Sequence, residues 1–281
     1  MQPKRWIENA RKVSVLGVDR RERRRLFWLY LRASWCNDRG RPLDTPVMAR
    51  LSWKGKPFDY LIREKLDFDA VSHIFLDGEY PLVNLGQPKI LFDVGSNVGA
   101  SVIWFKLGFP DVRIVALEPD PRNAEALRRN VAQFGEDVVV IERALYSEDG
   151  KKLQFYSSSK GHMSSSLFQR QETDQLVEVT TITLDTVMRE QGIDHIDLLK
   201  FDIEGGEYEM FNGFSGLGSV NLMVGEVHKD LLPSPLDEFM GLFKEGFELV
   251  DGEQSLADEK QRKPVVLLRN KRAEPEYRKA H

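Results

Sequence analysis

Beyond residue 90, the chain contains polar groups whose types and spacing suit a ligand-binding site. The first is an acid followed by two glycines, Asp93, Gly95 and Gly99, with Ser96 and Asn97 between the glycines. Glycines at a strand exit let the backbone turn tightly and approach a ligand closely. A carboxylate there would repel a phosphate and attract a cation. We therefore predict that Asp93, Gly95, Asn97 and Gly99 bind S-adenosylmethionine, whose sulfonium and amino groups are cationic.

The same segment departs from two common phosphate-binding motifs. Gly95 and Gly99 are four residues apart, whereas the dinucleotide fingerprint is G-x-G-x-x-G, and no Gly-Lys-Ser/Thr of a P-loop follows. A purely structural turn would explain the glycines, but not Asp93 together with Asn97. A nucleotide-dependent oxidoreductase therefore remains an alternative that these motifs disfavour.

A second carboxylate, Glu118, ends the next apolar run. It lies about 20 residues beyond the glycine turn, where an acid can accept hydrogen bonds from ribose hydroxyls. The competing interpretation is an exposed acid at a helix start, because Pro121 suits the first helical position. Taken together with the glycine turn, Glu118 is predicted to bind the ribose.

The densest group of titratable residues follows two later apolar runs. Asp202, Glu204 and Glu207 surround a Gly-Gly turn, and Glu226 and His228 end the next apolar run. Unpaired carboxylates at a strand end are costly, so a substrate, cation or hydrogen-bond network should account for them. We predict that His228 is a general base, since its unperturbed pKa lies near neutrality, and that Glu226 on the same strand face orients its ring.

If the predicted S-adenosylmethionine donates its methyl group, these residues are predicted to face the molecule that accepts it, the acceptor. Asp202, Glu226 and His228 are assigned to catalysis, and Glu204, Glu207 and His228 to substrate binding. An alternative uses a divalent cation such as Mg²⁺, held by Asp202 and by Glu226 or Glu204, to lower the pKa of the acceptor hydroxyl. No spacing here is diagnostic of a metal site, so this variant ranks second.

The elements that position these residues alternate regularly after Pro88. Short β-rich runs occur at residues 90–94, 112–117, 138–141, 196–201, 222–227 and 265–268, with helical periodicity at 121–134 and 236–244. This alternation predicts βαβ units around a parallel sheet, whose carboxyl ends hold the ligand. Between residues 151 and 183, two alternating segments predict an antiparallel pair flanking the serine-rich loop 157–166.

The first part of the chain has a different character. A helix is predicted from Asp19 to about Asn37, and residues 41–88 show no clear period, which suggests an irregular cap. We predict a helical and irregular N-terminal cap over residues 1–88 and a methyltransferase domain over 89–281. The aromatics of the cap have no core of their own, so we expect the cap to complete the acceptor pocket or to mediate a homo-oligomer contact.

Composition excludes several function classes. The 281 residues are 41% hydrophobic and 30% charged, with a net charge of −4 and one cysteine, Cys36. No apolar run approaches the roughly 20 residues of a membrane span, and a disulfide framework is excluded. The first 25 residues carry nine basic and three acidic side chains, which we interpret as a solvated helix face. We expect a cytoplasmic protein with a small-molecule partner, no nucleic acid and no membrane contact.

The motifs taken together resemble a known family. The segments 93–99, Glu118-Pro119, Ala144-Leu145, 183–185, 199–207 and 226–228 are similar to those of the FkbM family of S-adenosylmethionine-dependent methyltransferases. The resemblance runs from about Phe75 to Leu268, and the Lys-x-Asp-x-Glu-Gly element is its most specific part.

The resemblance carries implications for fold and activity. It implies an α/β fold, the class I methyltransferase Rossmann-like sheet, with seven mostly parallel strands and a reversed last strand. It adds Ser96, Pro119, Ala144 and Asp202 to the cofactor-binding residues, and implies O-methylation of a hydroxyl on a sugar or secondary-metabolite acceptor. A non-catalytic, partner-binding protein on the same fold remains an alternative.

Overall fold

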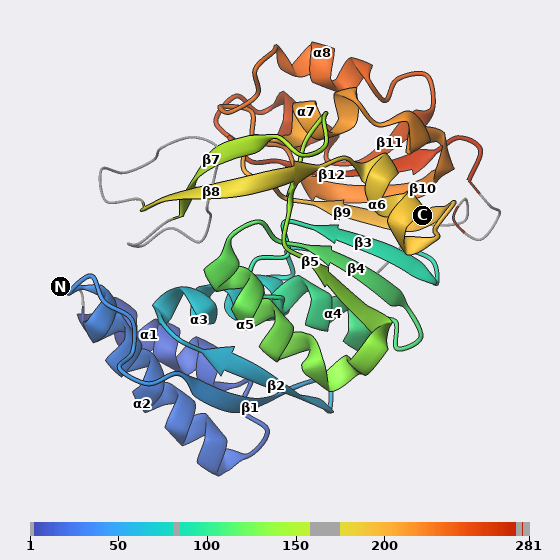
Figure 1. Cartoon of the computed structure of the whole chain (residues 1–281). Coiled ribbons are helices and arrows are strands. Elements are labelled where there is room, and N and C mark those ends of the chain that lie inside the picture. Colours follow the sequence, from blue (N-terminus) through green and yellow to red (C-terminus); the bar gives the residue numbers. More distant parts are fainter. Residues whose placement is uncertain (1–2, 81–84, 158–174, 274–276, 278–281) are drawn as a thin grey trace.

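A seven-stranded sheet forms the centre of the computed structural model, which describes residues 3–80, 85–157, 175–273 and 277 (Figure 1). The strand order is β11-β12-β10-β9-β3-β4-β5. Only β12 runs against its neighbours. The strands are β3 (Ile90–Val94), β4 (Arg113–Leu117), β5 (Val138–Ile141), β9 (Ile196–Phe201), β10 (Val220–Glu226), β11 (Phe247–Asp251) and β12 (Val265–Asn270). The predicted fold class is confirmed, including the reversed last strand. β11 lies outside the apolar runs that predict strands in the sequence.

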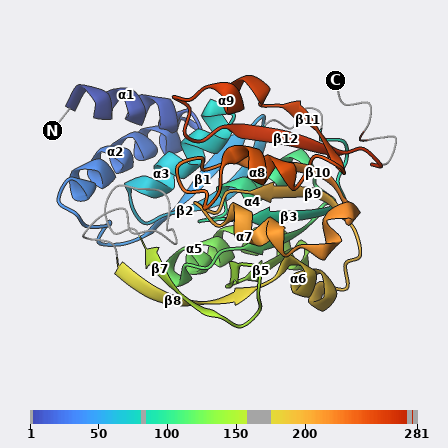
Figure 2. The ribbon, with the colours of Figure 1, turned by 90° about the horizontal axis from the view of Figure 1, so that it is seen from above.

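Helices cover both faces of this sheet, which explains why its central strands are apolar on both sides. α4 (Ala100–Gly108) and α5 (Pro121–Val131) pack on one face, and α6 (Leu184–Gln191), α7 (Glu207–Asn212) and α8 (Leu236–Gly241) on the other. Figure 2 shows this arrangement from above. The short α9 (Glu253–Ala257) precedes β12 and packs on it. All six residues of β9 are buried, so the acids that follow it emerge from the middle of the core.

The N-terminal cap is more regular than predicted. It contains α1 (Pro3–Ser14), α2 (Arg20–Asn37), the hairpin β1 (Val47–Trp53) and β2 (Lys56–Ile62), α3 (Lys65–Ser72) and a π-helical turn, His73–Asp77. The hairpin turns at Lys54 and Gly55, which both have positive φ, as two-residue hairpin loops of the primed type require. The prediction of an irregular segment over residues 41–88 was therefore wrong for residues 47–77, because the Lys54-Gly55 turn joins two strands and a helix follows them.

Aromatic contacts attach the cap to the sheet. The rings of Trp53 and Phe75 lie 4.2 and 5.2 Å from Trp104 on α4. Cap and sheet residues belong to one hydrophobic cluster, so the two parts share a core. The domain boundary at residue 88 stays a prediction.

Three short strands form a separate sheet beside the carboxyl end of the main one. β8 (Gln175–Ile182) lies between β6 (Ala144–Leu145), which is parallel to it, and β7 (Lys152–Ser157), which is antiparallel. This confirms the predicted antiparallel pair. Residues 158–166 of the serine-rich loop lie outside the described residues. The described residues also form two 3-10 helical segments, Ala132–Asp137 and Ser215–Ser219. No helix in the described part of the chain is long and apolar enough to cross a membrane.

Candidate active site

The glycine turn between β3 and α4 is held against the exit of β9. Gly95 has a φ of +76°, and a Cβ atom there would lie 1.8 Å from the carbonyl oxygen of Asp202. Gly99 caps α4 with a φ of +88°. Lys200 Nζ donates a 2.8 Å hydrogen bond to the carbonyl of Gly95. The turn therefore needs glycine because the backbones of two strands meet there.

Asp93 lies in the core beside Lys200. Its side chain is fully buried, and its Oδ1 lies 3.1 Å from Nζ of Lys200, the residue opposite it on β9. Ser101 Oγ donates a hydrogen bond to its other oxygen. Lys200 thus compensates the charge that was expected to attract a cationic ligand. A role of Asp93 in cofactor binding stays a prediction. The sequence places Lys200 in the Lys-x-Asp-x-Glu-Gly element, but gives no sign of this pairing.

Glu118 is held by backbone groups at the end of β4. One carboxylate oxygen accepts from the amide of Asn97 (2.8 Å) and the other from the amide of Asp120 (2.9 Å). Burial, together with the charge of Asp120, raises the pKa of Glu118 to about 8. Glu118 therefore ties the glycine turn to β4. Its role in ribose binding stays a prediction.

One cavity of about 490 Å³ connects the two groups of predicted residues. Volumes of this order suit a small-molecule site. Nine predicted residues line it: Gly95, Ser96, Asn97, Glu118, Pro119, Ala144, Asp202, Glu204 and Glu226. The remaining four, Asp93, Gly99, Glu207 and His228, are not among its lining residues. The cavity thus runs from the glycine turn to the acids after β9 and β10.

Residues that the sequence did not single out complete the walls. The cap contributes His73, Asp77, Glu79 and Tyr80, and Lys263 enters just before β12. The cap was expected to form part of a pocket, but no spacing signal identified these individual side chains. Lys263 Nζ lies 2.9 Å from Glu204 Oε1 and 3.9 Å from Glu226 Oε2.

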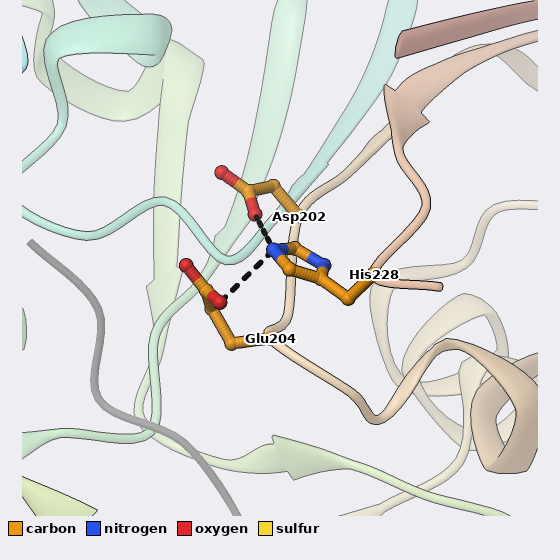
Figure 3. Close-up of side chains that lie close together, drawn as sticks. All are labelled: Asp202, Glu204 and His228. Carbon is orange, nitrogen blue, oxygen red and sulfur yellow. Dashed lines mark ion pairs between the residues drawn. The ribbon is translucent and has the colours of Figure 1, made fainter. Parts of the chain in front are cut away.

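His228 lies at the acid end of the cavity, among four carboxylates. Figure 3 shows it with two of them, Asp202 and Glu204. The side chain of His228 has no exposed surface. Nδ1 is 2.6 Å from Glu207 Oε1, whereas Nε2 is 2.9 Å from Glu204 Oε2, 3.4 Å from Glu226 Oε2 and 3.7 Å from Asp202 Oδ1. The residue that orients the ring is therefore Glu207, not Glu226 as predicted. Chain proximity favoured Glu226, but α7 brings Glu207 to the opposite nitrogen.

This environment changes the predicted acid–base chemistry. Burial alone lowers the pKa of His228, but pairing with Glu204 and Glu207 and the charge of Asp202 outweigh it and raise the pKa to about 10. Burial, with the charges of Asp202 and Glu79, raises the pKa of Glu226 to about 8. A histidine with a pKa near neutrality that faces the acceptor is not what the structure shows. The cavity-lining carboxylates are better placed to contact an acceptor.

Three of these residues also form a possible metal-ligand set. One donor atom each from Asp202, Glu204 and His228 lies within 4.8 Å of the others. The metal variant predicted from the sequence named Asp202 with Glu226 or Glu204, and did not include the imidazole.

Comparison with known proteins gives the chain several methyltransferase relatives. The family model described as "Methyltransferase FkbM domain" matches residues 93–249. The chain is 28% identical over 170 residues to methyltransferase sdnD of Sordaria araneosa, covering 50% of this chain and 66% of that protein. It is 27% identical over 199 residues to the 31-O-demethyl-FK506 methyltransferase FkbM of Streptomyces tacrolimicus, covering 60% and 76%. It is 26% identical over 141 residues to the 2-O-methyltransferase NoeI of Sinorhizobium fredii, covering 44% and 56%.

Proposed function

Because this chain belongs to the FkbM family of methyltransferases, we propose that it transfers the methyl group of S-adenosylmethionine to a hydroxyl of a sugar or secondary-metabolite acceptor. The observation that carries the proposal is the single cavity that joins the glycine turn and Glu118 to the carboxylates of Asp202 and Glu226. A methyl donor at the first end would meet an acceptor at the second. Two relatives are named for methylation at oxygen, at the 31-O and 2-O positions of their own acceptors.

The reaction needs little covalent help from the protein. The acceptor oxygen forms a bond to the methyl carbon while the bond from that carbon to sulfur breaks, which releases S-adenosylhomocysteine. The sulfonium is a good leaving group, so alignment of the two reactants and removal of the hydroxyl proton are the main tasks. Glu226 and Asp202 line the cavity and are the proposed proton acceptors. Glu226 accepts the proton in its ionised form, which predominates above its raised pKa of about 8.

His228 has a different part in this proposal. Its ring is buried and contacts the carboxylates from beneath the cavity wall. It therefore positions Asp202, Glu204 and Glu226, and Glu207 in turn fixes its ring through Nδ1. A positioning residue of this kind acts on the acceptor only through those acids.

Two measurements test the proposal. S-adenosylhomocysteine should raise the melting temperature of the chain, whereas NAD(P) should not, because a ligand stabilises the state that binds it. S-adenosylmethionine with a labelled methyl group should then label hydroxyl-bearing sugars or polyketide-type metabolites from a candidate set. Stabilisation by NAD(P) alone would favour an oxidoreductase, and stabilisation by neither ligand a non-catalytic protein.

A further inference from the structure

The acid end of the cavity contains buried polar atoms that the described residues leave without a hydrogen-bond partner. These atoms are Asp202 Oδ1 and the hydroxyl oxygen of Tyr80. Beside them, the buried Nε2 of His228 is surrounded by carboxylate oxygens, the nearest being Glu204 Oε2 at 2.9 Å. Asp202 and Tyr80 line the cavity, and Nε2 of His228 points toward the carboxylates of Asp202 and Glu204 (Figure 3). Buried polar atoms in proteins almost always have partners. Their grouping at one place indicates a polar or charged ligand.

The spacing of the donor atoms suits a single ion. Nε2 of His228 lies 2.9 Å from Glu204 Oε2 and 3.7 Å from Asp202 Oδ1. Ligands bonded to one divalent ion at about 2.0–2.2 Å lie about 3–3.5 Å from each other. Small side-chain adjustments would therefore place all three donors around one ion.

Glu207 supplies the support that a metal-binding histidine needs. Its Oε1 is 2.6 Å from Nδ1 of His228, and its other oxygen accepts the amide of Gly205 at 3.0 Å. A carboxylate on Nδ1 holds the proton there, so a cation would displace the proton of Nε2 and bind its lone pair. Metal-ligating histidines almost always have such a partner on the second nitrogen.

Lys263 pairs with a different oxygen of Glu204 from the one beside His228. Its Nζ lies 2.9 Å from Oε1 of Glu204, whereas His228 lies beside Oε2 of that carboxylate. The lysine therefore pairs with the other oxygen of Glu204. Asp202 Oδ1 and Glu204 Oε2 still face the imidazole.

We propose that Asp202, Glu204 and His228 bind one divalent cation of the Mn²⁺ or Zn²⁺ type at the acceptor end of the cavity. The imidazole suits Zn²⁺ and the two carboxylates suit Mn²⁺, whereas Mg²⁺ is usually bound by oxygen ligands alone. Binding of the cation does not depend on the proposed function, but its role does. There it would contact the acceptor oxygen and lower the pKa of the hydroxyl. Glu226 would take the proton as the new carbon–oxygen bond forms and the carbon–sulfur bond breaks.

Titration of the full chain with Mn²⁺, followed by the electron paramagnetic resonance signal of the free ion, tests this site. One Mn²⁺ per chain is expected. Asp202→Asn and His228→Gln should each weaken binding at least tenfold. Glu207→Gln should weaken it about 10- to 100-fold, the usual effect of losing a partner of a metal-bound histidine.

Glu209→Gln is the matched control. Glu209 lies on α7 like Glu207 but contacts Ser147, so Mn²⁺ binding should not change. Circular dichroism and a cooperative thermal unfolding transition check that each variant is folded, and His228→Asn replaces His228→Gln if the latter fails this check.

Two results would overturn the proposal. One is a wild-type chain that binds neither Mn²⁺ nor Zn²⁺ up to about 1 mM, the weak end of protein cation sites. The other is Mn²⁺ binding that Asp202→Asn and the His228 variant leave unchanged, which would place the ion elsewhere. Methyl transfer is assayed separately, with and without a chelator. Transfer without any cation binding would overturn the cation site alone, and cation binding without transfer would count only against the proposed function.

Discussion

The two ends of the cavity are built in different ways. At the predicted cofactor end, backbone groups make the decisive contacts: the amide of Asn97 donates to Glu118, and the carbonyl of Gly95 accepts from Lys200. At the acid end, side chains from the cap, from the segments after β9 and β10 and from Lys263 meet only in the folded protein. The first end is specified mainly by a local turn. The second depends on a balance of charges between distant segments.

This difference predicts how each end responds to change. A turn fixed by glycine geometry should tolerate the loss of distant segments as long as the sheet is intact. A group of carboxylates in a buried setting depends on each of its partners, because an unpaired charge there is costly.

Removal of the cap should have the largest effect. A chain beginning at Gln87 would lose Trp53 and Phe75, which pack on Trp104, and also Glu79 and the other cap residues of the cavity wall. It should expose a large apolar surface and aggregate, or lose turnover. Light scattering and turnover measurements check this. A monodisperse, fully active truncated chain would show that the cap is dispensable.

Neutralising one acid should affect the rate next most strongly. Glu226→Gln keeps the shape of the side chain but removes the proposed proton acceptor. Because general-base assistance contributes about 10²–10⁴ in rate, kcat should fall at least a hundredfold while the affinity for S-adenosylhomocysteine stays nearly intact. Steady-state kinetics with labelled S-adenosylmethionine measure both. Glu209→Gln is again the control, and an unchanged kcat in Glu226→Gln would remove Glu226 from the mechanism.

Changing Glu118 should affect binding rather than rate. Glu118→Ala removes the predicted bonds to the ribose, and hydrogen bonds to charged groups are worth roughly 1.5–3 kcal/mol. The affinity for S-adenosylhomocysteine should fall at least tenfold, as measured by calorimetry. Glu125→Ala, at an exposed position on α5, should bind normally. If the folded Glu118→Ala variant retains full affinity, the ribose assignment is incorrect.

A change of pH should affect the affinity for S-adenosylhomocysteine less than replacement of Glu118 does. The pKa of Glu118 is raised to about 8, so its carboxylate predominates only above that pH. Ribose hydroxyls donate best to the ionised form, so the affinity for S-adenosylhomocysteine should rise several-fold from pH 7 to 9. Calorimetry across this range should show a flatter profile for Glu118→Gln. A wild-type profile that is already flat would mean that the ribose does not contact this carboxylate.

The same raised pKa has a consequence for the stability of the ligand-free protein. A carboxyl with a raised folded-state pKa favours folding most below its ordinary pKa of 4.5, and this contribution is lost as pH rises through about 8. The melting temperature of the wild type should therefore fall as pH rises through about 8. Glu118→Gln, which has no ionisable group at this position, should not show this decrease.

Much of the architecture could be predicted from the sequence, because it follows from local patterns. Short apolar runs mark the buried strands, and their carboxyl ends carry the glycine turn, Glu118 and Asp202. Parallel strands bring those ends to one edge of the sheet. Nine of the predicted site residues consequently line one cavity. The Lys54-Gly55 turn is also a local sequence signal for the hairpin of the cap.

The pairing of charges was decided only by the tertiary structure. Asp93 meets Lys200 because β3 and β9 are neighbours in the sheet, and Glu207 rather than Glu226 orients His228 because α7 packs over the end of β10. Protonation depends on distance and burial between segments far apart in the chain, and spacing along the sequence carries neither. The sequence thus determined which residues reach the edge of the sheet. The fold determined which of them face the cavity and which of them compensate each other's charge.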